Sequence, residues 1–150
     1  MNMNRKPFLT PGEALEFHKD VLVVDTKMPA NHGLFYNNNM REAMKIWVEE
    51  GRLSRPEIQA KLYEMTVKEL KASEESRKEY LGIWEEAGVN VASVTYAGPH
   101  SPDGAFETAT RSLMQGRGTI DALGEDFRLV LNADDLERVY KDNVKGVIFD

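Results

Sequence analysis

The sequence predicts an α/β domain built on a parallel sheet. Four short apolar runs, each bounded by polar or turn residues, are typical of strands that are buried on both faces. The runs cover residues 21–25, 89–96, 127–131 and 146–150. Stretches with helical periodicity separate them, and this alternation is the pattern of parallel βα units. The 150 residues suffice for one domain with a core, so we assign 1–150 to a single α/β domain.

Composition and charge argue against several classes of partner. Hydrophobic residues make up 41% of the chain and charged residues 29%, which is typical of a folded, soluble domain. The formal net charge of −6 argues against nucleic acid, whose binding requires a basic surface. The absence of cysteine excludes disulfides and thiolate zinc sites. The sequence contains no secretory signal and no apolar run of membrane-spanning length, so we expect a cytoplasmic protein with no membrane partner.

Local signals predict a helix before the first strand and a helical insertion after it. Thr10 suits the N-cap of the first helix, Pro11 its first turn, and Glu13 completes a capping box. We expect Asp25 at the point where the first strand ends, followed by an Asn-rich loop and then the helical insertion over about residues 40–88.

The insertion contains two predicted helical regions. Met40, Met44 and Trp47 recur at helical spacing in the first region. A capping box at residues 54–57 opens the second, which we expect to break near Ser73 before the second strand. The later connections are also helical: residues 105–123 precede the third strand, and Asn132 caps a helix that precedes the last.

Candidate functional residues follow the predicted strands, because parallel α/β proteins bind ligands at the carboxyl ends of their strands. Asp25 and Lys27 are the candidate catalytic residues. Lys27 could lose its proton and act as a base or Schiff-base former, or remain a cation paired with Asp25, and we favour the pairing. The candidate substrate-binding residues are His32, Tyr96, His100 and Asn132. The loop that carries His32 is equally consistent with a turn-rich connection. His18 precedes the first strand, so we expect a surface or packing role for it.

Several of these side chains carry donors for a divalent metal, namely those of Asp25, His32, His100 and Asp150. No short spacing joins any two of them as a ligand pair, so we do not expect this chain alone to form a metal site. Asp25 is the one residue that we retain as a candidate metal ligand.

The order of the elements leaves two architectures open. Four parallel strands could form an open sheet or the first half of an eight-stranded barrel with a helical insertion after strand 1. The run 146–150 is apolar and no helix follows it in the sequence, so we expect it to leave one strand edge open. A second polypeptide or another copy of the chain would then complete the barrel.

Two segments resemble the membrane (renal) dipeptidase family, peptidase family M19. Residues 82–94 (GIWEEAGVNVASV) are similar to a helix-to-strand junction of that family, and residues 126–138 (DFRLVLNADDLER) to a strand and the helix after it. The resemblance extends over residues 21–150 and covers the amino-terminal half of a family member. It implies a (β/α)8 barrel of the TIM type, a two-zinc centre, and hydrolysis of dipeptides, so that the ligand is small and peptide-like.

The first strand departs from the family pattern. Members end this strand with Asp-Gly-His-x-Asp, whose His and second Asp bind zinc, whereas this chain has Asp25-Thr26-Lys27-Met28-Pro29. Lys27 and Pro29 therefore replace two zinc ligands, and neither side chain binds zinc in their place. Two hypotheses follow. The chain is a dipeptidase-like metallohydrolase fragment or subunit that acts only when further chain completes it, or it is a repurposed homologue that serves as a binding or structural subunit without zinc.

Overall fold

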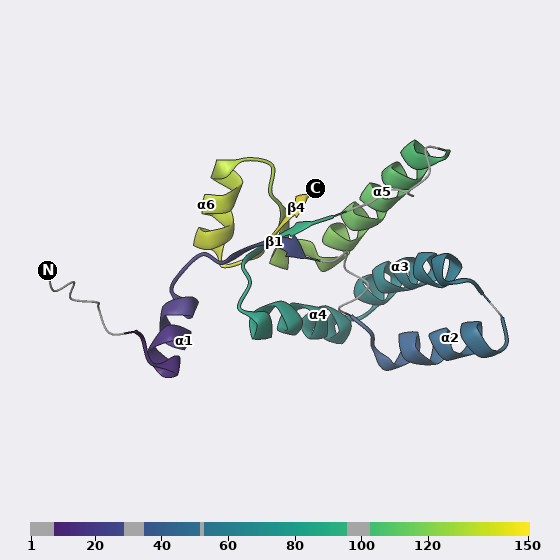
Figure 1. Ribbon diagram of the computed structural model, residues 1–150, viewed down its shortest axis with the longest axis horizontal. Helices are drawn as coiled ribbons and strands as arrows, with labels where there is room; N and C mark the ends of the chain where they lie inside the picture. Colours follow the sequence, from purple (N-terminus) through teal and green to yellow (C-terminus); the bar gives the residue numbers. More distant parts are fainter. Residues whose placement is uncertain (1–7, 29–34, 52, 96–102) are drawn as a thin grey trace, which may run out of the picture.

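The computed structural model describes residues 8–28, 35–51, 53–95 and 103–150 of the chain (Figure 1). The helices are α1 (Pro11–Lys19), α2 (Asn38–Glu49), α3 (Arg55–Ala72), α4 (Glu74–Ala87), α5 (Ala105–Leu123), the short 3-10 helix η2 (Gly124–Asp126) and α6 (Ala133–Asp142). The strands are β1 (Val24–Met28), β2 (Val91–Val94), β3 (Phe127–Leu129) and β4 (Lys145–Phe149). The predicted α/β class is therefore confirmed. None of the helices in the described ranges is long and apolar enough to cross a membrane.

The four strands form one parallel sheet in the order β1-β2-β4-β3. The prediction that the last strand leaves an edge open is wrong, because β4 pairs with β2 on one side and with β3 on the other. Val147 of β4 is only 2% exposed, while Ile148 packs against the cluster on the opposite face. A strand that is apolar on both faces gains most from the centre of a sheet, since burial removes both faces from water. Among the described strands, β1 and β3 are the end strands of the sheet.

Helices cover both faces of this sheet. Neighbouring residues of a strand point to opposite faces, and Ala92 packs in a cluster with side chains of α3, α4 and α5. Val91, its neighbour in β2, packs instead with Val139 of α6. In the first half of a (β/α)8 barrel, the strands follow one another in chain order and every helix lies on the outer face. The observed sheet differs in both respects. β4 lies between β2 and β3, and α6 covers the face of the sheet opposite to α3, α4 and α5.

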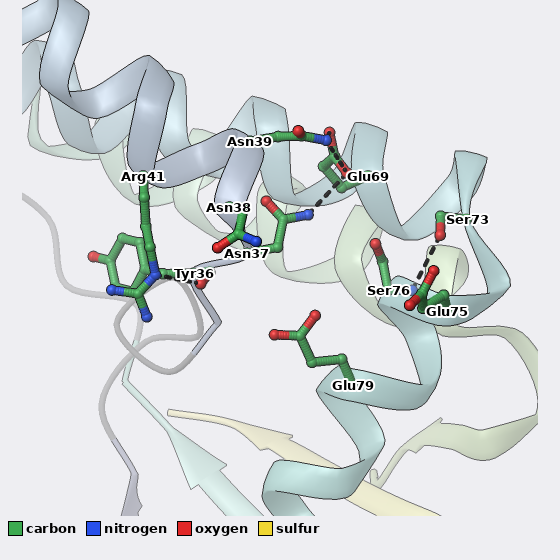
Figure 2. A pocket seen from close by; sticks show the side chains of 10 residues that line it. All are labelled: Tyr36, Asn37, Asn38, Asn39, Arg41, Glu69, Ser73, Glu75, Ser76 and Glu79. Carbon is green, nitrogen blue, oxygen red and sulfur yellow. Dashed lines mark hydrogen bonds between the residues drawn. The ribbon is translucent and has the colours of Figure 1, made fainter.

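The helical insertion consists of α2, α3 and α4 in the described part of residues 40–88. The predicted break at Ser73 is confirmed, because Ser73 ends α3 in an extended conformation and its hydroxyl accepts a hydrogen bond from the Ser76 N–H at 3.1 Å. A polar cavity of about 450 Å³ opens between the start of α2, the end of α3 and the start of α4 (Figure 2).

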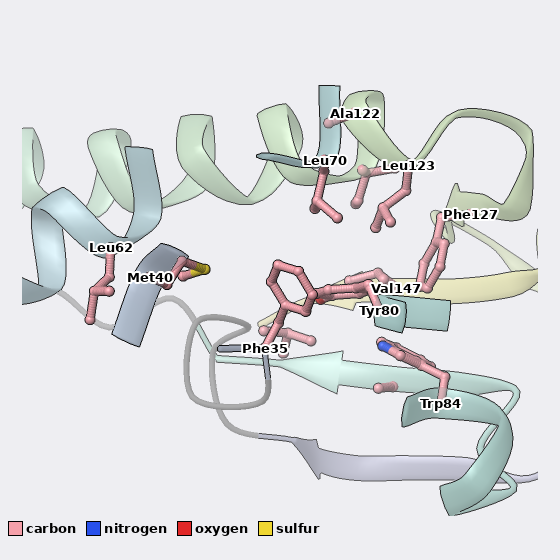
Figure 3. Close-up of a cluster of buried hydrophobic side chains, with 13 residues drawn as sticks. Phe35, Met40, Leu62, Leu70, Tyr80, Trp84, Ala122, Leu123, Phe127 and Val147 are labelled. Atoms are coloured by element: carbon pink, nitrogen blue, oxygen red, sulfur yellow. The ribbon is translucent and has the colours of Figure 1, made fainter. Parts of the chain in front are cut away.

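A group of aromatic rings joins the insertion to the sheet (Figure 3). Trp84 of α4 meets Phe127 of β3 edge to face, with ring centroids 5.1 Å apart. Tyr80 lies one helical turn earlier, and its centroid is 5.7 Å from those of both Phe127 and Phe35. Such pairs add about 0.5–1.5 kcal/mol each beyond the burial of their area. These ring contacts connect α4 of the insertion directly to β3.

Helix α1 stands apart from the body of the domain (Figure 1). It has the predicted capping box, in which the Thr10 N–H donates to the Glu13 carboxylate at 2.8 Å, but it contains no buried residue. His18 packs against Gly88, the left-handed C-cap of α4, where an added Cβ would collide with the imidazole ring. His18 therefore has the predicted packing role, near the amino-terminal end of β2.

Candidate functional site

The carboxyl ends of three adjacent strands bring together a lysine, two hydroxyls and a carboxylate. Lys27 lies near the end of β1, Ser93 and Thr95 lie in and just after β2, and Asp150 directly follows β4. The Ser93 hydroxyl donates a hydrogen bond to Oδ2 of Asp150 at 2.6 Å. We refer to these four residues as the edge cluster. Its position is the one at which parallel α/β folds bind ligands.

The edge cluster keeps the Asp150 side chain ionised. The hydrogen bond from Ser93 lowers the pKa of this carboxyl most, followed by a hydrogen bond from Thr95, and the positive charge of Lys27 lowers it further; partial desolvation acts in the opposite direction. A carboxylate with a lowered pKa is a poor general base. It therefore does not activate the Ser93 hydroxyl as a nucleophile, and the cluster is better suited to holding a charged ligand than to attacking one.

Asp25 lies inside β1, so the prediction that it marks the end of the strand is wrong. The strand continues through Met28 because Met28 still pairs with Val94 of β2, after a register shift that follows Asp25. The half-buried Asp25 side chain accepts a hydrogen bond at Oδ1 from the backbone N–H of Lys27 at 2.9 Å. The predicted ion pair between Asp25 and the Lys27 ammonium is not formed; the two residues interact through the backbone instead.

The other candidate residues are only partly covered by the structure. His32, Tyr96 and His100 lie outside the described residues, and so does Pro29. Asn132 follows β3 and is exposed, but its side-chain oxygen accepts the Asp135 N–H at 3.1 Å as the N-cap of α6. This capping role is the local one that the sequence predicts, and it occupies the amide oxygen.

The donors in the edge cluster do not fit a pair of zinc ions. Within the described ranges, no three His, Asp or Glu side chains lie close enough together to hold a metal ion. The cluster contains an ammonium group, which repels a dication, and the Asp150 carboxylate already accepts bonds from Ser93 and Thr95. Asp25 alone cannot replace the ligand set that the dipeptidase resemblance implies.

The sequence pattern does not mark the two hydroxyls of the edge cluster as candidate functional groups. Ser93 and Thr95 belong to the run 89–96 and resemble ordinary strand residues. The available signal is that Ser93 and Thr95 lie two residues apart at the carboxyl end of a strand, because such residues share a face of the sheet and can bind one group together. The sequence marks Asp150 only as a metal donor, because its hydrogen-bond partner Ser93 lies 57 residues away in the chain.

The polar cavity of Figure 2 lies in the helical insertion and contains no residue of the edge cluster. Glu69 of α3 accepts hydrogen bonds from Asn37 at 2.9 Å and from Asn39 at 3.3 Å, so it ties the start of α2 to α3. Glu75 and Glu79 of α4 also line the cavity and make it acidic. The side chains of Asn37 and Asn39 are thus accounted for by helix capping and by a structural contact to Glu69.

Comparison of the chain with protein-family models, with curated proteins and with solved structures gives no match. The resemblance to the dipeptidase family therefore depends on the sequence segments 82–94 and 126–138 alone.

Proposed function

We propose that this chain is a binding domain whose edge cluster holds a small, zwitterionic, peptide-like ligand without zinc. The observation that carries the proposal is the placement of opposite charges at one edge of the sheet: Lys27 near the end of β1 and Asp150 directly after β4 flank β2, whose Ser93 hydroxyl donates to Asp150 at 2.6 Å. A free dipeptide carries one ammonium and one carboxylate at pH 7. It can offer its carboxylate to Lys27 and its ammonium to Asp150.

The hydrogen bonds around Asp150 support recognition of an ammonium group. Ser93 and Thr95 donate to the carboxylate and keep it ionised and oriented. A charge-assisted hydrogen bond to a fixed carboxylate is about twice as strong as a neutral one. The edge is therefore complementary to a ligand that carries both signs of charge.

A dipeptidase-type zinc hydrolase is the second candidate function. It is favoured by the similarity of residues 126–138 to the strand and helix of the dipeptidase family. This candidate implies that the chain is half of a (β/α)8 barrel, which a further stretch of chain or a second polypeptide would complete. Because barrel interiors are filled by strand side chains, closure would require α6 to leave the face on which Val139 packs against Val91. It would also require metal ligands from outside the described residues.

Calorimetric titration of the purified protein with glycylglycine tests the proposal. We expect binding that is unchanged by EDTA, and about tenfold weaker binding in Lys27→Gln and in Asp150→Asn, because each loses one charged contact. Lys141→Gln, which removes an exposed lysine of α6, serves as the matched control. The doubly blocked N-acetylglycylglycine amide should not bind, since it carries neither charge.

Two outcomes would decide against this function. If glycylglycine does not bind, or binds equally well to Lys27→Gln and Lys141→Gln, the edge cluster is not the ligand site. If added zinc chloride produces hydrolysis of glycylglycine that EDTA abolishes, the dipeptidase candidate is favoured instead.

A further inference from the structure

A buried hydroxyl in the helical insertion has no hydrogen-bond partner. Three serine or threonine side chains are buried in the described part of the chain, namely those of Thr66, Ser76 and Thr119. The hydroxyls of Thr66 and Thr119 each donate to the carbonyl one helical turn earlier, at 2.9 Å and 3.1 Å. Ser76 is only 6% exposed, yet its hydroxyl makes no hydrogen bond to any described residue. Because buried polar groups are normally paired, this hydroxyl indicates a partner from outside the chain.

The Ser76 side chain lines the polar cavity of the insertion (Figure 2). Its volume of about 450 Å³ lies within the range of cavities that bind small molecules. Glu79 follows Ser76 by three residues in α4, a spacing that puts both side chains on one face of the helix. Glu69 of α3 and Glu75 of α4 also line the cavity, whereas Arg41 is the one basic residue among the described lining residues. The cavity therefore carries a net negative charge.

The carboxylates of Glu75 and Glu79 are not neutralised by a neighbouring cation. Neither forms an ion pair within 4 Å with the side chains that the structure describes. They lie four residues apart on one helix, a spacing at which like charges repel each other. Glu75 lies in the first turn of α4, where the helix dipole favours a negative charge, but Glu79 lies in the second turn, beyond that effect. A cation bound in the cavity would offset this repulsion.

We propose that this cavity binds a small aliphatic diamine, with one ammonium group against Ser76 and Glu79 and the other against Glu69. An ammonium group has three N–H donors and no acceptor, so it matches a hydroxyl oxygen and carboxylates, and its bonds to carboxylates are charge-assisted. Asn37 and Asn39 already hold the Glu69 carboxylate in place. Among the described residues, no three acidic or histidine side chains converge on one metal position, which favours an extended organic cation over a single metal ion.

Calorimetric titration with 1,4-diaminobutane at low ionic strength measures this binding. Glu75 and Glu79 are exposed, so water and salt screen their charges, and we expect a dissociation constant of about 0.1–1 mM. Butylamine has the same carbon chain but a single ammonium group, so it should bind at least tenfold more weakly. Amide chemical shifts in nuclear magnetic resonance spectra locate the diamine, and those of Ser76 and Glu79 should move during the titration.

Substitutions on α4 give the decisive comparison. Glu79→Gln should weaken binding of the diamine about tenfold, because it removes a charged acceptor but keeps the shape of the side chain. Ser76→Ala should weaken it about fivefold, because it removes the hydroxyl acceptor. Glu74→Gln is the matched control: it removes an equal charge from the same helix, but Glu74 pairs with Lys78 at 2.7 Å and does not line the cavity. This control should bind the diamine as the wild type does.

Several results would overturn the proposal. The cavity is not a diamine site if 1,4-diaminobutane fails to bind at about 10 mM, or if Glu79→Gln and Glu74→Gln bind it equally well. Unchanged affinity in Ser76→Ala would mean that water alone satisfies this hydroxyl. Loss of diamine binding in Asp150→Asn would place the ammonium group at the edge cluster instead. Circular dichroism checks the fold of each variant. Glycylglycine should bind Glu79→Gln and the wild type equally, so the two binding proposals fail or hold separately.

Discussion

Gly146→Ala is the perturbation that best tests the placement of α6. Gly146 is buried in β4, and a Cβ at this position would lie 2.8 Å from a methyl group of Val130 and 3.0 Å from methyl groups of Val139 and Val91. Three contacts this short cannot be relieved by one side-chain rotation. Overpacking of this kind costs about 1–3 kcal/mol, so we expect Gly146→Ala to lower the free energy of unfolding by that amount.

The same contacts predict how a second substitution compensates. Val139→Ala should itself cost about 1–3 kcal/mol, because it leaves a cavity under α6. In the double variant, the smaller residue at 139 makes room for the new methyl group. We therefore expect the double variant to be more stable than the sum of the single effects implies, by about 0.5–2 kcal/mol.

Urea unfolding followed by circular dichroism measures all four members of this cycle. Gly82→Ala in α4 is the control for the general effect of alanine, because no atom lies within 4 Å of the added Cβ and the helix should gain up to about 1 kcal/mol. If Gly146→Ala leaves the free energy of unfolding unchanged, or if the two substitutions change it additively, α6 does not lie over Gly146. The open sheet with helices on both faces would then be refuted, and the half barrel would become the better architecture.

Three further predictions concern α1, acid stability and base stability. Gly88→Ala should destabilise the domain by more than about 1 kcal/mol, because alanine at φ +66° is strained by about this amount and its Cβ would also collide with His18. Adding His18→Ala should remove the collision but not the strain, so thermal unfolding should show that the double variant recovers only part of the lost stability. The lowered pKa of Asp150 stabilises the fold above the ordinary carboxyl pKa, and this contribution is lost as the pH falls through the folded value, so Asp150→Asn should flatten the acid limb of stability against pH. Burial raises the pKa of Tyr63 to about 12, so stability should fall as the pH rises from the ordinary tyrosine pKa through this value, and ultraviolet titration of wild type against Tyr63→Phe should report it.

Local chemistry accounts for the features that could be predicted from sequence. Thr10 and Ser54 begin their helices because each capping box closes over four residues. Asn132 caps α6 by contact with a residue only three positions away. Apolar runs located all four strands, although β1 begins and ends about three residues later than predicted because its pairing with β2 continues through Met28.

Long-range contacts account for what could not be predicted. No local pattern distinguishes a sheet in which β2 pairs with β4 from one in which it pairs with β3, because both orders bury the same runs. The choice depends on which strand is apolar on both faces. It also depends on the packing of Val91 of β2 against Val139 of α6. The edge cluster has the same limitation: the position of Lys27 was predictable, but its neighbour Asp150 is brought close only by the final strand order.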